Sequence, residues 1–251
     1  MLLLSLSTQS LIFCILTLFF AGTVKGILGM GLPLVAVPIL ATFFDLPTAI
    51  ALMIFPILVS NIIQVWEGKK NAISIRRFLP MIITLIPCTI FAAQYLTEIN
   101  LKTGLIILGF IVIIFSLSQL IKVKFHINKR SEAILSPLIG ILSGLIGGVS
   151  TLIGPVIAMY FVSLKMQKDT FVGTIAFVFL AFSITLYITM ALNGALNIEN
   201  ISSSALIGIP VMAGVFFGGK LRKSINLKTF EIALITCLIC IGLNLLRKGF
   251  F

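Results

Sequence analysis

Long apolar runs separated by short polar loops constrain the fold of this chain more than any other feature of its sequence. A helix of about 20 apolar residues crosses a bilayer core of roughly 30 Å. Charged residues make up only 10% of the chain, whereas a soluble domain needs far more polar surface. We therefore expect an all-α polytopic membrane protein. The longest apolar runs cover residues 11–29, 49–66, 78–96, 104–121, 171–192, 205–218 and 230–246.

The chain also repeats itself. The segment Ile99–Thr103 recurs as Ile225–Thr229, 126 residues later. A duplicated half made of apolar segments is typical of transporters built from two repeats. We predict a first transmembrane repeat over residues 1–121, a basic cytoplasmic linker over residues 122–132 and a second repeat over residues 133–251. Three glycines of the first half recur after 118 residues, since Gly22, Gly26 and Gly29 match Gly140, Gly144 and Gly147.

Each half opens with a long and then a short apolar stretch. In the first half these cover residues 11–29 and 32–44, and in the second half residues 134–146 and 154–164. The second stretch of each pair is too short to cross a bilayer comfortably. We predict a broken or re-entrant helical hairpin, followed by three transmembrane helices, in each half. Because no basic residue precedes Lys25, we expect the first run to belong to the mature fold and not to a signal peptide.

Corresponding loops of the two halves carry opposite charge. Loop 67–77 holds four basic residues and its counterpart 193–202 holds none, whereas loop 97–103 holds one lysine and its counterpart 219–229 holds four basic residues. Basic loops stay on the cytoplasmic side of a membrane. We therefore predict that the two repeats have inverted topology, with both chain termini outside.

Glycine and proline mark a break in each predicted hairpin. Gly31 followed by Pro33, and Gly154 followed by Pro155, indicate that one helix ends and another begins. A helix that starts at mid-membrane directs free N–H groups inward, which favours a small anion. Alternatively, the glycines only allow helices to pack closely. The residues that we assign to substrate binding at the two breaks are Gly29, Gly31, Gly147, Gly148, Ser150 and Thr151.

A second group of candidates is polar and lies within apolar runs. Ser60, Asn61 and Gln64 share one helical face and could orient an anion, with Thr174 as the second half's contribution. Interhelical hydrogen bonding is the alternative role for these side chains. Lys25 is either a counter-charge for the anion or a lysine that reaches the membrane interface.

Other chemistry finds little support in the sequence. The single histidine, His126, lies in the basic linker, and the four cysteines lie in apolar runs. We therefore expect neither a metal nor a cofactor, and no nucleophile–base pair that would make the chain an enzyme. The net charge of +11 comes from short loops, so we expect no nucleic-acid partner.

The paired glycine-rich segments 22–40 and 140–160 resemble those of the sulfite exporter TauE/SafE family, also described as sulfonate-uptake permeases. Gly173-Thr174 resembles part of the family's Gly-Thr-Ser element, which Ala49–Leu52 of the first half lacks. Ser60–Gln64 and the basic loop after it resemble one branch of the family. The likeness covers essentially the whole chain. It implies a permease that moves small sulfur-containing or organic anions across the inner membrane, commonly with ion or proton coupling.

We predict a secondary transporter for a small anion such as sulfite, a sulfonate or a related organic acid. The anion would bind near the bilayer midplane at the two glycine-rich hairpin tips, and movement of the repeats would alternate access. The expected partners are the anionic solute and the lipid bilayer, and the oligomeric state stays open, a homo-oligomer included. The alternatives are an anion channel and a membrane scaffold subunit that transports nothing.

Overall fold

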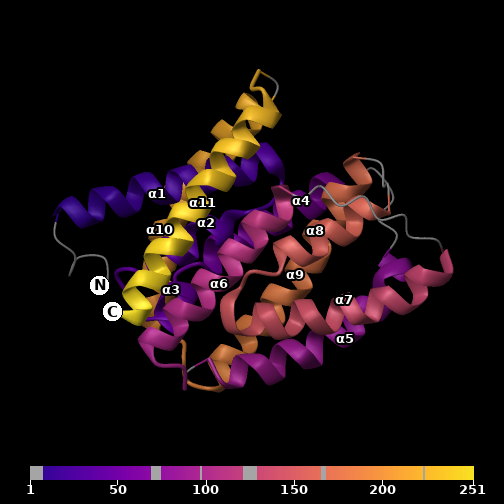
Figure 1. Ribbon diagram of the computed structural model, residues 1–251, viewed down its shortest axis with the longest axis horizontal. Coiled ribbons are helices and arrows are strands. Elements are labelled where there is room, and N and C mark those ends of the chain that lie inside the picture. Colours follow the sequence, from indigo (N-terminus) through magenta and orange to yellow (C-terminus); the bar gives the residue numbers. More distant parts are fainter. Residues whose placement is uncertain (1–7, 69–74, 97, 121–128, 165–167, 223) are drawn as a thin grey trace. The chain divides into compact units, whose positions relative to one another are not determined.

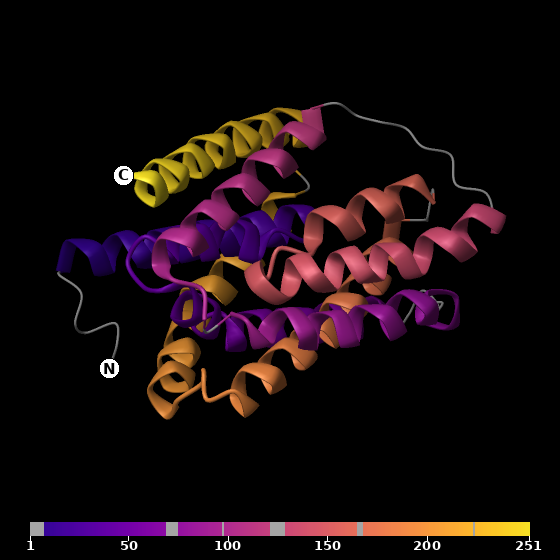
Figure 2. The ribbon, with the colours of Figure 1, turned by 60° about the horizontal axis from the view of Figure 1, so that its bottom comes forward.

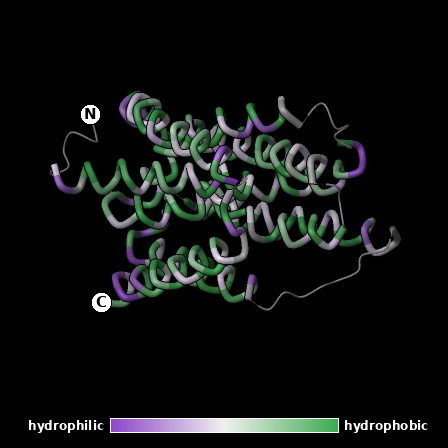
Figure 3. Tube along the Cα trace, turned by 90° about the horizontal axis from the view of Figure 1, so that it is seen from above, coloured by the Kyte–Doolittle hydropathy of each residue, from purple (hydrophilic) through white to green (hydrophobic). Residues whose placement is uncertain are grey.

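A computed structural model describes residues 8–68, 75–96, 98–120, 129–164, 168–222 and 224–251. All regular elements within these ranges are helices, which confirms the all-α class. Eight stretches of the described residues are long and apolar enough to cross a membrane, and hydrophilic residues gather at helix ends (Figure 3). The helices are α1 (Thr8–Leu28), α2 (Leu32–Leu40), α3 (Leu46–Ala51), α4 (Ile54–Gly68), α5 (Ile75–Gln94), α6 (Leu101–Leu120), α7 (Lys129–Ser150), α8 (Gly154–Ser163), α9 (Lys168–Leu192), α10 (Ile198–Leu221) and α11 (Leu227–Phe250).

The same order of helices occurs in each half of the chain. A long helix, α1 or α7, is followed by a short one, and three further spans complete the half. The short helices α2 and α8 have 9 and 10 residues, as the lengths of the apolar stretches predicted. α2 ends four residues earlier than expected because residues 41–44 turn back on its last carbonyl groups. α7 extends beyond its apolar run at both ends.

The repeated sequence Ile-Asn-Leu-Lys-Thr forms the same local structure twice. Asn100 precedes α6, and its side-chain oxygen accepts a 2.8 Å hydrogen bond from the N–H of Thr103. Asn226 precedes α11 and accepts one of 3.3 Å from the N–H of Thr229. An asparagine immediately before a helix satisfies one of its free N–H groups in this way. The repeat therefore encodes two equivalent helix starts.

The helices form two compact units that do not follow the two halves of the sequence. The first unit comprises residues 1–56, 98–122 and 195–251, and the second comprises residues 57–97 and 123–194. In the first unit α1 packs on α10, and α6 lies beside α11 (Figure 2). In the second unit α7 lies beside α5 (Figure 1). The first span of each half thus packs against the third span of the other half.

Glycines allow these helix pairs to approach closely. A Cβ atom on Gly22 of α1 would overlap the carbonyl oxygen of Val211 on α10. A Cβ atom on Gly144 of α7 would lie 2.6 Å from the carbonyl oxygen of Leu85 on α5. Small residues at helix crossings drive association in membranes because backbones can then make van der Waals contact. The glycines that recur in the sequence therefore pack the same kind of pair in each unit.

The second span of the first half is interrupted between α3 and α4. Pro56 lacks an N–H group and cannot bond back along the helix. The N–H of Phe55 donates to the Oγ of Ser204 on α10, at 2.9 Å, instead of to a carbonyl of its own helix. This proline and the hydrogen bond to Ser204 account for the interruption.

Candidate functional site

The first break lies between α1 and α2. Gly29 follows the end of α1 with a φ of 81°, and its N–H donates to the carbonyl oxygen of Lys25 at 2.7 Å. Gly31, with a φ of 97°, precedes α2, whose first turn contains Pro33. Such left-handed conformations cost a residue with a side chain about 1–2 kcal/mol. Both glycines are thus required by the backbone of the break.

The second break, between α7 and α8, closes in the same way. Thr151 follows the end of α7 with a φ of 63°, the only positive φ among the described residues other than glycines. Its N–H donates to the carbonyl oxygen of Gly147 at 2.6 Å, and its hydroxyl donates to the carbonyl oxygen of Ser150. A threonine in the left-handed region is strained. The two long helices therefore end in the same backbone form, with glycine at one turn and threonine at the other. The short helices begin differently, because Gly31 before α2 is left-handed whereas Ile153 before α8 has a φ of −79°.

Thr151 leads to a prediction about stability. Replacing it with glycine should relieve the left-handed strain and stabilise the fold by about 1 kcal/mol, which corresponds to a rise of roughly 2–4 °C in the melting temperature of a chain of this size. Thermal unfolding of the purified variant in detergent measures this. Thr151→Ser keeps the strain and should melt like the wild type. A T151G variant that melts below both would contradict the assignment of strain.

The free backbone N–H groups of each break lie at the start of its short helix, later in the chain than most of the glycines that we assigned to substrate binding. Gly147, Gly148 and Ser150 are still within α7, where backbone N–H groups bond along the helix. The first N–H groups of α2 and α8 have no intrahelical acceptor, and neither helix has a side-chain cap. The groups available to an anion are therefore those at the starts of these two short helices, next to Gly31 and Gly154.

Gly147 and Gly148 have packing roles. A Cβ atom on Gly148 would lie 2.6 Å from the Cβ of Ala92 on α5, and one on Gly147 would lie 2.7 Å from the ring of Phe182 on α9. Packing was the alternative that the sequence left open for these glycines. Their contribution to substrate binding stays a prediction.

The polar residues of α4 share a buried face. Ser60 and Asn61 are each 1% exposed, and Gln64 is also buried, whereas Ile62 between them is 50% exposed. The hydroxyl of Thr174 on α9 is buried and finds no hydrogen-bond partner among the described residues. A buried hydroxyl without a partner costs free energy unless something else satisfies it. Thr174 is therefore the strongest candidate in this group for contact with a ligand.

Lys25 lies inside the protein. Its side chain is 2% exposed, in the last turns of α1. Val24, which precedes Lys25, lies close to the start of α2, because a Cβ atom on Gly31 would be 3.3 Å from its side chain. The start of α2 therefore lies against the turn of α1 that carries the lysine. An ionisable residue buried at membrane depth is costly and usually functional. Burial of the side chain does not fit a lysine that extends along the outside of α1, and the role of Lys25 as a counter-charge stays a prediction.

One further polar residue was missed in the sequence. Ser143 of α7 is fully buried, and its hydroxyl has no hydrogen-bond partner within the described part of the chain. It follows Gly140 by three residues, as Lys25 follows Gly22. The repeat offset of 118 residues was the signal that could have identified it. Lys25 and Ser143 are therefore equivalent positions in the two halves.

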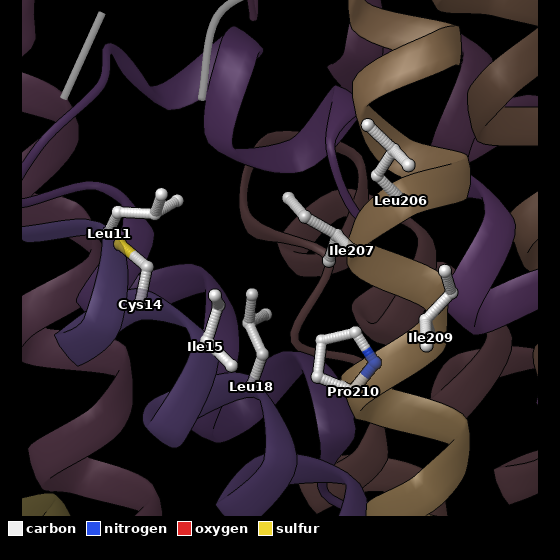
Figure 4. Close-up of a pocket in the computed structure, with 8 residues that line it drawn as sticks. All are labelled: Leu11, Cys14, Ile15, Leu18, Leu206, Ile207, Ile209 and Pro210. Carbon is white, nitrogen blue, oxygen red and sulfur yellow. The ribbon is translucent and has the colours of Figure 1, made fainter. Parts of the chain in front are cut away.

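The groove between α1 and α10 is not an anion site. It has a volume of about 330 Å³ and is lined by apolar side chains and Cys14 (Figure 4). Its rim includes Ile15 and Ile209, which are 44% and 68% exposed. Apart from the weakly donating thiol of Cys14, an anion would find no side-chain hydrogen-bond donor there. Nor do the described residues contain a group of three metal-ligating side chains.

Comparison with known proteins identifies one family. The family model described as Sulfite exporter TauE/SafE matches residues 14–245, nearly the whole chain. No curated protein and no solved structure matches. The match includes both breaks, the polar face of α4 and Thr174.

Proposed function

The chain belongs to the sulfite exporter TauE/SafE family, and from this we propose that it is a secondary transporter of a small anion such as sulfite, a sulfonate or a related organic acid. It is a multi-pass membrane protein, and we place it in the inner membrane. We assign it no enzymatic activity. The solute and the lipid bilayer are its partners in this proposal.

The pair of matching helix breaks is the observation that carries the proposal. Each compact unit holds one break, at which a short helix begins without a side-chain cap. Interrupted helices of this kind bind anionic groups of substrates in transporters with inverted repeats. We propose that N–H groups at the start of each short helix bind the transported anion. Access then alternates when one repeat moves against the other.

Flux into liposomes tests this function. The purified chain, reconstituted in lipid vesicles, should take up labelled sulfite or methanesulfonate at a rate that saturates with concentration. A rate that rises without saturation would favour an anion channel. No uptake above that of protein-free vesicles would contradict transport and favour the scaffold alternative.

Thr174 tests whether buried polar groups contact the solute. Thr174→Val keeps the shape and removes the hydroxyl. If the hydroxyl bonds to the anion, uptake should fall by about 10-fold or more, while stability is unchanged or improved because an unsatisfied group is gone.

Thr189→Val on the same helix is the matched control, because the hydroxyl of Thr189 is also buried but donates to the carbonyl oxygen of Thr185 at 2.9 Å. Its uptake should stay within about twofold of the wild type, since this bond lies within the helix. Equal uptake by both variants would remove Thr174 from the site.

A further inference from the structure

Two buried hydroxyls of the second unit lie outside its break. Ser136 of α7 is 2% exposed and Tyr160 of α8 is 4% exposed. Neither hydroxyl has a hydrogen-bond partner among the described residues. Buried polar groups are costly when they make no hydrogen bond, and most of them in proteins make one. These two hydroxyls therefore need a partner from outside the described part of the chain.

The two hydroxyls are neighbours near one end of the second unit. The hydroxyl of Ser136 is near enough to influence the phenol of Tyr160, as are the charges of Glu132 and Arg77. Glu132 lies in the first turn of α7 and pairs with Arg77 in the first turn of α5, where Nη2 donates to Oε2 at 2.7 Å. Tyr160 lies in the last turn of α8. α8 therefore runs back from the break toward the end of the unit at which α5 and α7 begin.

Thr174 of α9 lies at the height of the middle of α8. The rings of Phe161 on α8 and Phe171 on α9 have centroids 6.3 Å apart. A Cβ atom on Gly154, at the start of α8, would lie 3.6 Å from the ring of Phe179 on α9. Thr174 lies between these two contacts in the sequence of α9, and its buried hydroxyl also lacks a partner in the described ranges. Unsatisfied hydroxyls thus accompany α8 from its middle to its last turn.

Other buried serines of the same unit satisfy their hydroxyls within their own helix. Ser150 donates to the carbonyl oxygen of Ile146 at 2.6 Å, and Ser183 donates to that of Phe179 at 2.6 Å. A serine inside a helix can bond in this way to the carbonyl four residues before it. Ser136 lies in α7 and does not make this bond. Its hydroxyl is therefore available to a ligand.

Resting on the proposed function, we infer that Ser136 and Tyr160 form a second binding site for the transported anion. The site lies between the break of the second unit and the end at which α5 and α7 begin. Its ligand is a small oxyanion, such as sulfite or a sulfonate, whose oxygens accept hydrogen bonds from the two hydroxyls. The solute follows α8 between the break and this pair, past Thr174.

The chemistry of the pair suits a site that the solute leaves again. Hydrogen bonds from O–H groups to a charged oxygen are stronger than those between neutral groups. The ion pair of Arg77 and Glu132 beside the site is neutral as a whole, so it adds no net charge that would hold the anion. Passage through a membrane protein requires binding that is strong enough for entry and weak enough for release.

Labelling of a cysteine at position 136 tests the site without measuring transport. The four native cysteines are replaced by alanine, and Ser136→Cys or Ser183→Cys is added. A methanethiosulfonate reagent that carries a sulfonate group forms a mixed disulfide with any thiol that it reaches. Ser183 is the matched control, because it is also 2% exposed but donates within its own helix.

In reconstituted vesicles S136C should react at least about tenfold faster than S183C, and saturating methanesulfonate should slow its reaction. Equal reaction of the two variants would overturn the inference. So would a reaction of S136C that methanesulfonate does not slow, because water alone would then reach the pair. Both results are independent of uptake by the wild type, whose absence would instead contradict the proposed function.

Tyr160→Phe tests the second hydroxyl and removes nothing else. If the phenol binds the anion, methanesulfonate uptake should fall by about 10-fold. The melting temperature should not fall below that of the wild type, because an unsatisfied buried group is gone. Unchanged uptake by Y160F would remove the phenol from the site.

Discussion

Replacing Gly22 with alanine should destabilise the protein strongly. The added methyl group would overlap the carbonyl oxygen of Val211, which belongs to the backbone of α10 and cannot rotate away. Overpacking costs about 1–3 kcal/mol, or more where the neighbour is rigid. We expect a cost at the upper end of this range, which lowers the melting temperature by roughly 6–12 °C.

Gly140→Ala should have an equivalent effect in the second unit. Its methyl group would overlap the carbonyl oxygen of Met81 on α5. The two substitutions lie in different units, so their similar losses would show that both helix pairs depend on close backbone contact. Thermal unfolding in detergent and the yield of monodisperse protein measure this.

Gly219 of α10 provides the matched control. A Cβ atom there would have no neighbour within 4 Å. Alanine also favours a helix over glycine by about 1 kcal/mol. Gly219→Ala should therefore melt at or slightly above the wild-type temperature. Equal melting of G22A, G140A and G219A would contradict the packing role of the recurring glycines.

Local features of the chain were predictable because they depend on short stretches of sequence. The lengths of the apolar runs predicted the spans, and Gly31, Pro33 and Gly154 marked both breaks. The recurrence of Asn100 as Asn226 led to two equivalent helix caps. In each case the cause is the conformational preference of a few neighbouring residues.

The partners of each helix could not be predicted in the same way. Packing of α1 on α10 depends on the fit of Gly22 and Gly26 against a segment nearly 200 residues away. The sequence shows that these glycines are small but not which backbone they meet. For the same reason it could not separate the packing glycines of α7 from the amide donors at the start of α8.

The sequence could not predict the direction of the Lys25 side chain, for a different physical reason. A lysine three residues before the end of an apolar helix can extend its side chain either to the interface or into the protein. In the structure the side chain of Lys25 is 2% exposed and extends into the protein. Its burial depends on neighbours that are distant in the sequence, which a local pattern does not reveal.

A carboxylate at either break should abolish anion transport. Gly31 and Thr151 have left-handed backbone conformations, with φ of 97° and 63°, which asparagine and aspartate tolerate better than other residues with side chains. Gly31→Asp and Thr151→Asp place a negative charge next to the N–H groups proposed to bind the solute. Two like charges about 5 Å apart repel by about 3 kcal/mol at an effective dielectric constant near 20. Uptake of methanesulfonate should fall roughly 100-fold or more.

Asparagine at the same two positions isolates the effect of charge. It has nearly the shape of aspartate and carries no charge, so G31N and T151N should keep uptake within several-fold of the wild type. Aspartate before a helix stabilises it, so G31D should melt no lower than G31N, and a loss of uptake cannot be attributed to unfolding. If the aspartate and asparagine variants transport equally well at both breaks, the short-helix starts do not bind the anion. If the aspartate and asparagine variants differ in uptake at only one break, the unit that contains that break binds the solute alone.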